Sequence, residues 1–284
     1  MLSSELAEAP TVELFRAGLR AQTAEERERV LQMLTARATL EVLDAAVDAT
    51  RSPEPAEREF AADVLGELPH KREFHEGAVR ALVEICDKED VGDVLVAAIS
   101  GLGNRGDDGA LETILVLRRH PEPQVRWAVA AALPLLAKEG RSLERATAAL
   151  IQLSRDEDAD VRDVATYGLG TQLRDAGWER GEPQAVGRAL LERVDDEDLD
   201  TRSEALLGLA YRGDDRAVEP LLKALGEDVV GSLAVEAAAE LGDPRLLPAL
   251  HELTEWWDAD QALLDRAVER CSGAASSEEA QPSP

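Results

Sequence analysis

A repeated segment is the feature of this chain that most limits its fold. Six stretches align in one register, each with a leucine near its end, and successive leucines lie 31 to 40 residues apart. These leucines are Leu65, Leu102, Leu133, Leu169, Leu209 and Leu241. Between the stretches run other segments with apolar residues three and four positions apart, such as Val218, Leu221 and Leu222. Repetition at this period predicts stacked helical hairpins rather than one closed core.

Composition and turn residues agree with helices. The chain is 44% hydrophobic but only 3% aromatic, which favours alanine- and leucine-rich helices over sheets. The sequence Gly-Asp-Asp occurs at Gly106 and again at Gly213. Glycine there suits a left-handed helix end, and the following aspartate suits the cap of the next helix.

The repeats carry a recognisable pattern in DADVRDVATYGLG (158–170) and GLAYRGDDRAVEPLLKAL (208–225). This pattern resembles the HEAT repeat family, in particular its short bacterial, phycobilisome-lyase-like type. The resemblance implies an all-α fold, a right-handed α-solenoid of about six HEAT-like helical hairpins with terminal capping helices. Two repeats depart from the pattern. At the position where the other four repeats have arginine, they have Leu95 and Ala234.

The predicted domain organisation follows from this array. We expect N-terminal capping helices in residues 1–37, repeats in 38–254 and a C-terminal capping helix in 255–271. Residues 272–284 lack large apolar side chains and are expected to form a disordered acidic tail. Trp256 and Trp257 are adjacent, so they cannot share one helix face. We expect one to be packed and the other exposed.

One face of the aligned helices is the predicted contact surface. When the repeat arginine is numbered zero, positions −1, +3 and +7 form the buried stripe, and positions +1, +5 and +8 lie opposite. The resemblance implies that this opposite face lines a concave surface. Position +8 carries small residues such as Gly66 and Gly170, which would let another chain approach. The alternative is that aromatic residues of this face fill space between repeats. The predicted partner-binding residues are Trp127, Asp163, Tyr167, Leu207 and Tyr211.

A ladder of repeat arginines, Arg126, Arg162 and Arg202, invites a phosphate-binding interpretation. The resemblance implies instead that each arginine pairs with an aspartate of an adjacent repeat. Asp160 and Asp200, two residues before their arginines, are the predicted partners.

Charge indicates the kind of partner. The net charge of −27 would repel the phosphates of nucleic acid, so none is predicted. A cluster at Asp195, Asp196, Glu197 and Asp198 predicts an acidic rim that attracts a basic protein or peptide. The alternative for this cluster is an ordinary solvated turn. Its residues lack the order of a calcium-binding loop.

Enzymes built on HEAT-like repeats provide the competing hypotheses. Deoxyhypusine hydroxylase is similar in repeat design and binds iron through four His-Glu pairs, whereas this chain has only His75-Glu76 and His251-Glu252. DNA glycosylases and bilin lyases share the architecture, but charge opposes the first and no local motif supports the second. We therefore predict no catalytic residue, no metal site and no cofactor. The expected function is a non-catalytic protein-interaction scaffold, and the alternative is a HEAT-like enzyme of hydroxylase, glycosylase or lyase type.

The expected compartment is the cytoplasm. The first residues lack a basic and apolar leader, and no uncharged apolar run is long enough to span a bilayer. Cys86 and Cys271 lie far apart in helical patterns and are expected to be reduced thiols. Oligomeric state and the identity of the partner stay open.

Overall fold

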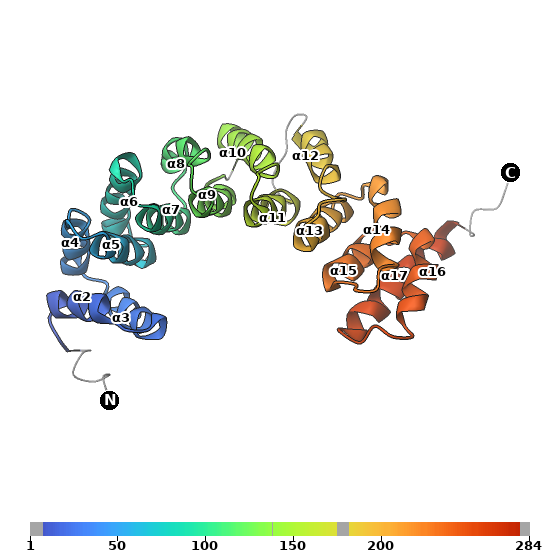
Figure 1. The fold of residues 1–284 in the computed structure, drawn as a ribbon, viewed down its shortest axis with the longest axis horizontal. Coiled ribbons are helices and arrows are strands. Elements are labelled where there is room, and N and C mark those ends of the chain that lie inside the picture. Colours follow the sequence, from blue (N-terminus) through green and yellow to red (C-terminus); the bar gives the residue numbers. More distant parts are fainter. Residues whose placement is uncertain (1–7, 138, 175–181, 279–284) are drawn as a thin grey trace. The chain divides into compact units, whose positions relative to one another are not determined.

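The structure, a computed structural model, describes residues 8–137, 139–174 and 182–278. Figure 1 shows its helices. The chain divides into two compact units, Met1–Lys138 (unit 1) and Glu139–Pro284 (unit 2). The described residues form helices, turns and loops, with no strand among them. Stacked helical hairpins, as predicted, build each unit.

Unit 1 is made of consecutive helix pairs. Helices α5, α7 and α9 pack side by side in one layer, and α4, α6 and α8 form a second layer (Figure 1). The pair α2 and α3 precedes them, and α3 packs against α5. The bounds are α2 (Thr11–Arg20), α3 (Ala24–Arg37), α4 (Leu40–Ala49), α5 (Pro55–Glu67), α6 (Arg72–Lys88), α7 (Gly92–Arg105), α8 (Leu111–Leu117) and α9 (Pro123–Leu136).

Unit 2 repeats this design. Helices α11, α13, α15 and α17 pack in sequence as one layer, while α10 packs against α12 and α14 against α16. A π-helical segment, η2 (Gly168–Gln172), continues α11. The bounds are α10 (Gly140–Leu153), α11 (Ala159–Tyr167), α12 (Glu182–Leu191), α13 (Leu199–Ala210), α14 (Val218–Leu225), α15 (Ser232–Leu241), α16 (Leu247–Leu253) and α17 (Gln261–Glu278).

The predicted buried stripe and caps are confirmed. Positions −1, +3 and +7 of α11 and α13 are fully buried. The predicted aspartates Asp107 and Asp214 each accept a hydrogen bond from the backbone N–H two residues later, at the starts of the short helical turns Asp108–Ala110 and Asp215–Ala217. Gly106 and Gly213 adopt the left-handed conformation, with φ of 61° and 59°. Local sequence therefore defines where these helices begin and end.

The repeat arginines are structural, as predicted. The Nη1 atoms of Arg126, Arg162 and Arg202 each donate to the carbonyls five and six residues earlier in the chain. Carboxylates of the following repeat complete the ladder, in the pairs Arg58–Glu89, Arg162–Asp196 and Arg202–Glu227. Arg58, Arg162 and Arg202 thus each join their own loop to the next one.

The predicted partners of these arginines were wrong. Asp160 and Asp200 are exposed and face away from the ladder, because two positions turn a helix by about 200°. The carboxylates that bind the arginines come instead from the loops before α7, α13 and α15.

A second set of buried arginines escaped the sequence analysis. Arg105 and Arg212 each lie three residues beyond an aligned leucine. Arg105 donates to two carbonyls at the end of α5, and Arg212 donates to two carbonyls of η2. Burial lowers the pKa of Arg212 to about 10. These side chains satisfy carbonyls that have no partner within their own helices.

Glycines at position +8 serve the stack rather than a partner. A Cβ added to Gly66 would lie 2.6 Å from the Cα of Gly101, and one added to Gly170 would lie 3.0 Å from the Cα of Gly208. Gly66 and Gly170 are buried. The interpretation that these glycines open the surface to another chain was therefore wrong, because neighbouring aligned helices already occupy that space.

The C-terminal end differs in part from the expectation. Helix α17 continues to Glu278, so the tail predicted to be disordered from Ser272 begins as helix. Strong helix formers, Ala274 and Ala275, extend it. Residues 279–284 lie outside the described part. Trp257 is buried and donates its Nε1–H to the Val230 carbonyl at 2.8 Å, while Trp256 is exposed, as predicted for the pair.

Candidate protein-interaction face

The predicted partner-binding residues fall in both units. Trp127 lies on α9 of unit 1 and is 42% exposed. Asp163 and Tyr167 lie on α11 of unit 2, and Tyr211 follows α13. Tyr167 is 37% exposed, and Asp163 and Tyr211 are partly exposed. Unit 2 therefore holds the larger part of the predicted set.

Leu207 was wrongly placed on this surface, because it is only 3% exposed. The outward line of α13 runs through Asp200, Glu204 and Tyr211. These residues lie about 160–200° around the helix from Arg202. Leu207 lies to one side of that line and turns into the stack.

The predicted acidic rim is mostly engaged within the protein. The carboxylate of Asp196 is 5% exposed and binds both Arg162 and Arg193. Burial alone would raise the pKa of Asp196, but the hydrogen bond from Arg162 holds it below its usual value. Asp198 caps α13. As free partner-binding carboxylates, these two aspartates were wrong predictions.

The other two rim residues reach solvent. Asp195 is exposed and binds Lys223 Nζ at 2.7 Å. That contact lowers the pKa of the Asp195 carboxyl. Glu197 is 92% exposed and lies 3.6 Å from Arg162. Most of the rim's negative charge is therefore balanced by neighbouring cations.

Unbalanced negative charge lies instead on the outward side of α11, α13 and α15. We call this surface the acidic face. Within the described part of the chain, none of its six carboxylates forms an ion pair. They belong to Asp160, Asp163, Asp200, Glu204, Glu236 and Glu240.

The hydrogen bonds of the acidic face come from neutral groups. Thr171 Oγ1 lies 3.4 Å from Glu204 Oε2, and the Tyr211 hydroxyl donates to Glu236 Oε1 at 3.2 Å. Oδ1 of Asp163 is buried without a hydrogen-bond partner. The Arg174 guanidinium lies 4.5 Å over the Tyr211 ring. A buried acceptor without a donor is costly, so Oδ1 of Asp163 lowers the stability of this helix.

The pKa values of two carboxyls reflect this crowding. Burial, followed by the charge of Asp163, raises the pKa of Glu204 to about 7. Burial, followed by the charges of Asp200, Asp198 and Asp160, raises the pKa of Asp163 to about 6. An approaching cation would stabilise the charged forms of both groups.

The π-helical segment positions part of this face. The N–H of Leu173 bonds the carbonyl of Gly168, five residues earlier. This wider turn, which is common at functional sites, places Thr171 beside Glu204. Sequence analysis missed Glu204 and Glu236. Both stand two positions after the arginine position of their helices, and that repeated position was the available signal.

These raised pKa values predict a pH-dependent stability. Between about pH 4 and 7 the folded chain binds more protons at Asp163 and Glu204 than the unfolded chain, so their contribution to the free energy of unfolding falls as pH rises. Glu204→Gln should nearly equal the wild type at pH 4, below the ordinary glutamate pKa, and melt about 2–4 °C higher at pH 8. Thermal unfolding followed by circular dichroism measures the difference. Glu255→Gln, at an exposed site, should show no such trend; a trend shared by both variants would contradict the assignment.

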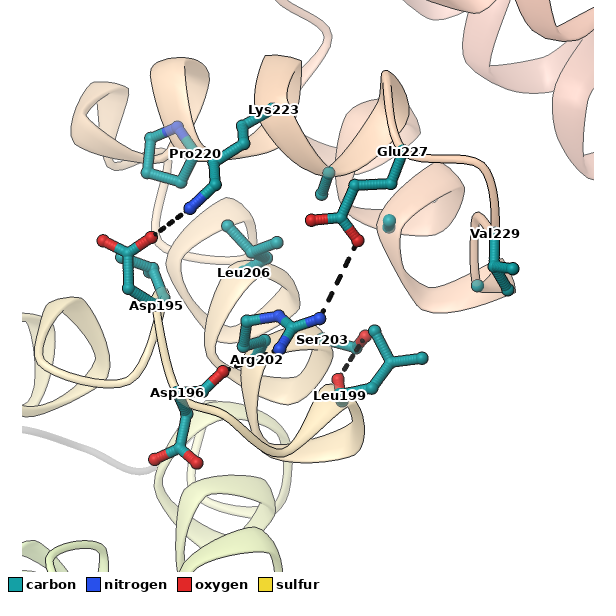
Figure 2. Close-up of a pocket in the computed structure, with 14 residues that line it drawn as sticks. Asp195, Asp196, Leu199, Arg202, Ser203, Leu206, Pro220, Lys223, Glu227 and Val229 are labelled. Atoms are coloured by element: carbon teal, nitrogen blue, oxygen red, sulfur yellow. Dashed lines mark hydrogen bonds and ion pairs between the residues drawn. The ribbon is translucent and has the colours of Figure 1, made fainter.

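A separate small hollow lies beside α13 in unit 2, with a volume of about 140 Å³ (Figure 2). Leu206 lies at its centre, and Arg202 faces Glu227 across it.

In the part of the chain that the structure describes, no group of three or more histidine, cysteine or acidic residues is arranged to hold a metal ion. Among those same residues, no helix has the length and apolar character needed to cross a membrane.

Comparisons with known proteins agree with the architecture. A family model described as HEAT repeats matches residues 79–170 and 187–270, more than half of the chain. Protein YibA of Escherichia coli strain K12 is 31% identical over 121 residues, which are 43% of this chain and 40% of that protein. YibA of strain O157:H7 matches to the same extent. The match thus spans less than half the length of these curated relatives.

Solved structures show the same fold. The X-ray structure of E. coli YibA has a TM-score of 0.74 at 22% identity, covering 94% of each chain. A crystal structure of an engineered protein has a TM-score of 0.55 at 17% identity, covering 92% of this chain and 77% of that one. Human deoxyhypusine hydroxylase has a TM-score of 0.37, which carries no argument about activity.

Proposed function

This chain belongs to the HEAT repeat family, and from that premise we propose that it is a non-catalytic scaffold that binds a basic protein or peptide. The proposed binding surface is the acidic face of α11, α13 and α15 in unit 2. The helical stack holds the carboxylates, and the partner brings the missing positive charge.

One observation carries this proposal, the six carboxylates of the acidic face that form no ion pair among the described residues. Half-buried carboxylates repel one another, and burial weakens the hydration that would relieve the repulsion. A lysine or arginine from a partner relieves both effects at Asp163 and Glu204. Complementary charge of this kind gives specificity and speeds association.

Aromatic side chains on the same unit support a protein partner. Tyr167 is exposed between Asp163 and Thr171 along the same helical path, and the half-buried Tyr211 follows α13, where it bonds Glu236. Tyrosine is enriched among residues that dominate binding energy, because its ring is large and its hydroxyl bonds easily. The exposed ring of Tyr167 thus supplies an anchor, and the carboxylates supply charge.

The test is binding of a fluorescein-labelled peptide rich in lysine and arginine, with leucines between them. Asp163→Asn combined with Glu204→Gln should weaken binding about tenfold, or 1.4 kcal/mol. Tyr167→Ala should also weaken it, and added salt should weaken the wild type. Fluorescence anisotropy gives the affinities, and circular dichroism confirms folding.

The matched control is Asp265→Asn with Glu269→Gln on the exposed side of α17. It removes the same two charges elsewhere on unit 2 and should change the affinity less than about twofold. Equal weakening by the two double variants would show that net charge alone attracts the peptide, and the proposal would fail.

A further inference from the structure

The hollow beside α13 lies where the arginine ladder is interrupted. Its floor is apolar, with Leu206 and Ala234 both buried and Ala224 at one side. Charged side chains of both signs stand at its edge, as Figure 2 shows for Arg202 and Glu227. Ala234 holds position zero of α15, the position that is arginine in α9, α11 and α13.

The repeat of α15 lacks the arginine that binds two loop carbonyls in the repeats before it. In α9, α11 and α13 the repeat arginine binds carbonyls five and six residues earlier. The equivalent residues for α15 are Asp228 and Val229, and the side chain of Ala234 has no group that can donate to them. Val229 lines the hollow and is largely exposed.

The carboxylate of Glu227 is held more loosely than its counterparts. Glu89 accepts two hydrogen bonds from Arg58, at 2.7 and 3.0 Å. Asp196 accepts two from Arg162, at 3.1 and 3.0 Å. Glu227 lies 3.8 Å from the nearest Arg202 nitrogen, beyond hydrogen-bonding distance. A guanidinium from outside would therefore find a carboxylate ready to accept it.

We infer that this hollow binds one arginine side chain of a protein partner, beside the position that Ala234 leaves without a ladder arginine. Its aliphatic stem lies on Leu206 and Ala224, and its guanidinium donates to Glu227. A volume of about 140 Å³ equals roughly five water molecules, enough for one long side chain. Arginine fits better than lysine, because its planar fork serves a carboxylate and neighbouring carbonyls together.

The cations at the edge of the hollow do not oppose this occupant strongly. Lys223 is bound to Asp195. Arg202, held by the carbonyls of Asp196 and Glu197, shares Glu227 with the incoming guanidinium, as Arg162 and Arg193 share Asp196. The site goes beyond the proposed function, since it lies apart from Asp163 and Tyr167 and neither residue lines it.

The test uses N-acetyl-arginine amide as the probe, with the uncharged citrulline and norleucine derivatives for comparison. Methyl NMR signals of Leu199, Leu206 and Val229 report binding at the hollow. Arginine should shift them to saturation, and the other two derivatives should bind at least about tenfold more weakly. Glu227→Gln should weaken arginine binding by a similar factor. Equal response to all three derivatives, or unchanged binding to Glu227→Gln, would overturn the inference.

A second variant fills the hollow from within. Ala234→Arg should place a guanidinium at the empty ladder position and abolish the probe response. Ala262→Arg adds the same charge at an exposed site on α17 and should leave affinity within about twofold of the wild type. A folded Ala234→Arg that still binds the probe would contradict the site. If Ala234→Arg does not fold, the affinity of Glu227→Gln for the arginine probe tests the inference instead. The double variant Asp163→Asn, Glu204→Gln should bind the basic peptide more weakly and still bind the arginine probe. That result would show that the two sites are distinct.

Discussion

Replacing Arg162 with glutamine is expected to lower the free energy of unfolding of unit 2 by about 3–5 kcal/mol. Arg162 is 8% exposed, and its partner Asp196 is 5% exposed. The substitution removes two hydrogen bonds to Asp196 and two to the carbonyls of Asp156 and Glu157. Arg193 still binds Asp196, which places the loss toward the lower end of the range.

Arg155→Gln is the matched control for this prediction. Arg155 binds Glu192 through the same two-bond geometry, at 2.6 and 2.9 Å, but the two side chains are 49% and 46% exposed. Water screens this pair, so the loss should stay below about 1 kcal/mol. Urea unfolding followed by circular dichroism measures both losses. Equal losses at the two sites would show that burial of the ladder does not determine its contribution.

The sequence predicted the helices and the ladder because both depend on short, repeated spacing. A leucine near each helix end, the stripe around it and the aspartate caps all act within a few residues. Arg162 and Arg202 repeat at the same register, so their common structural role followed from the pattern. Their acidic partners, by contrast, lie 34 and 25 residues further along the chain. Spacing alone cannot identify such partners.

The binding surface was only partly predictable for a related reason. A helical wheel treats each helix alone, whereas neighbours in the stack decide how far each helix is rotated. Leu207 met the wheel criterion and is buried, and Glu204 failed it and faces outward. In the sequence Asp196 is one of a run of acidic residues, but in the structure it is paired with Arg162. The total negative charge was predictable from the sequence. Which carboxylates pair with a cation and which do not could be seen only in the folded structure.

Gly208→Ala and Gly273→Ala should change stability in opposite directions. A methyl group at Gly208 would meet the Cα of Gly170 at 2.5 Å, where helix α13 crosses η2. Backbone atoms cannot turn aside as a side chain does, so the helices must separate, at about 1–3 kcal/mol. At Gly273 on α17 the methyl meets nothing within 4 Å. Alanine there should stabilise the helix by about 0.5–1 kcal/mol.

The glycine pair also ties the stack to the acidic face. The Cβ that would be added at Gly170 lies 3.2 Å from the carbonyl of Glu204, so the close crossing fixes how near Asp163 and Glu204 approach. Separation of the helices should hydrate both carboxyls and ease their repulsion, so Gly208→Ala should show a smaller fall in stability with rising pH than the wild type. Thermal unfolding at pH 5 and pH 8 measures this change. A destabilised Gly208→Ala that keeps the full pH dependence would show that the crossing supports the fold without setting the charge spacing of the face.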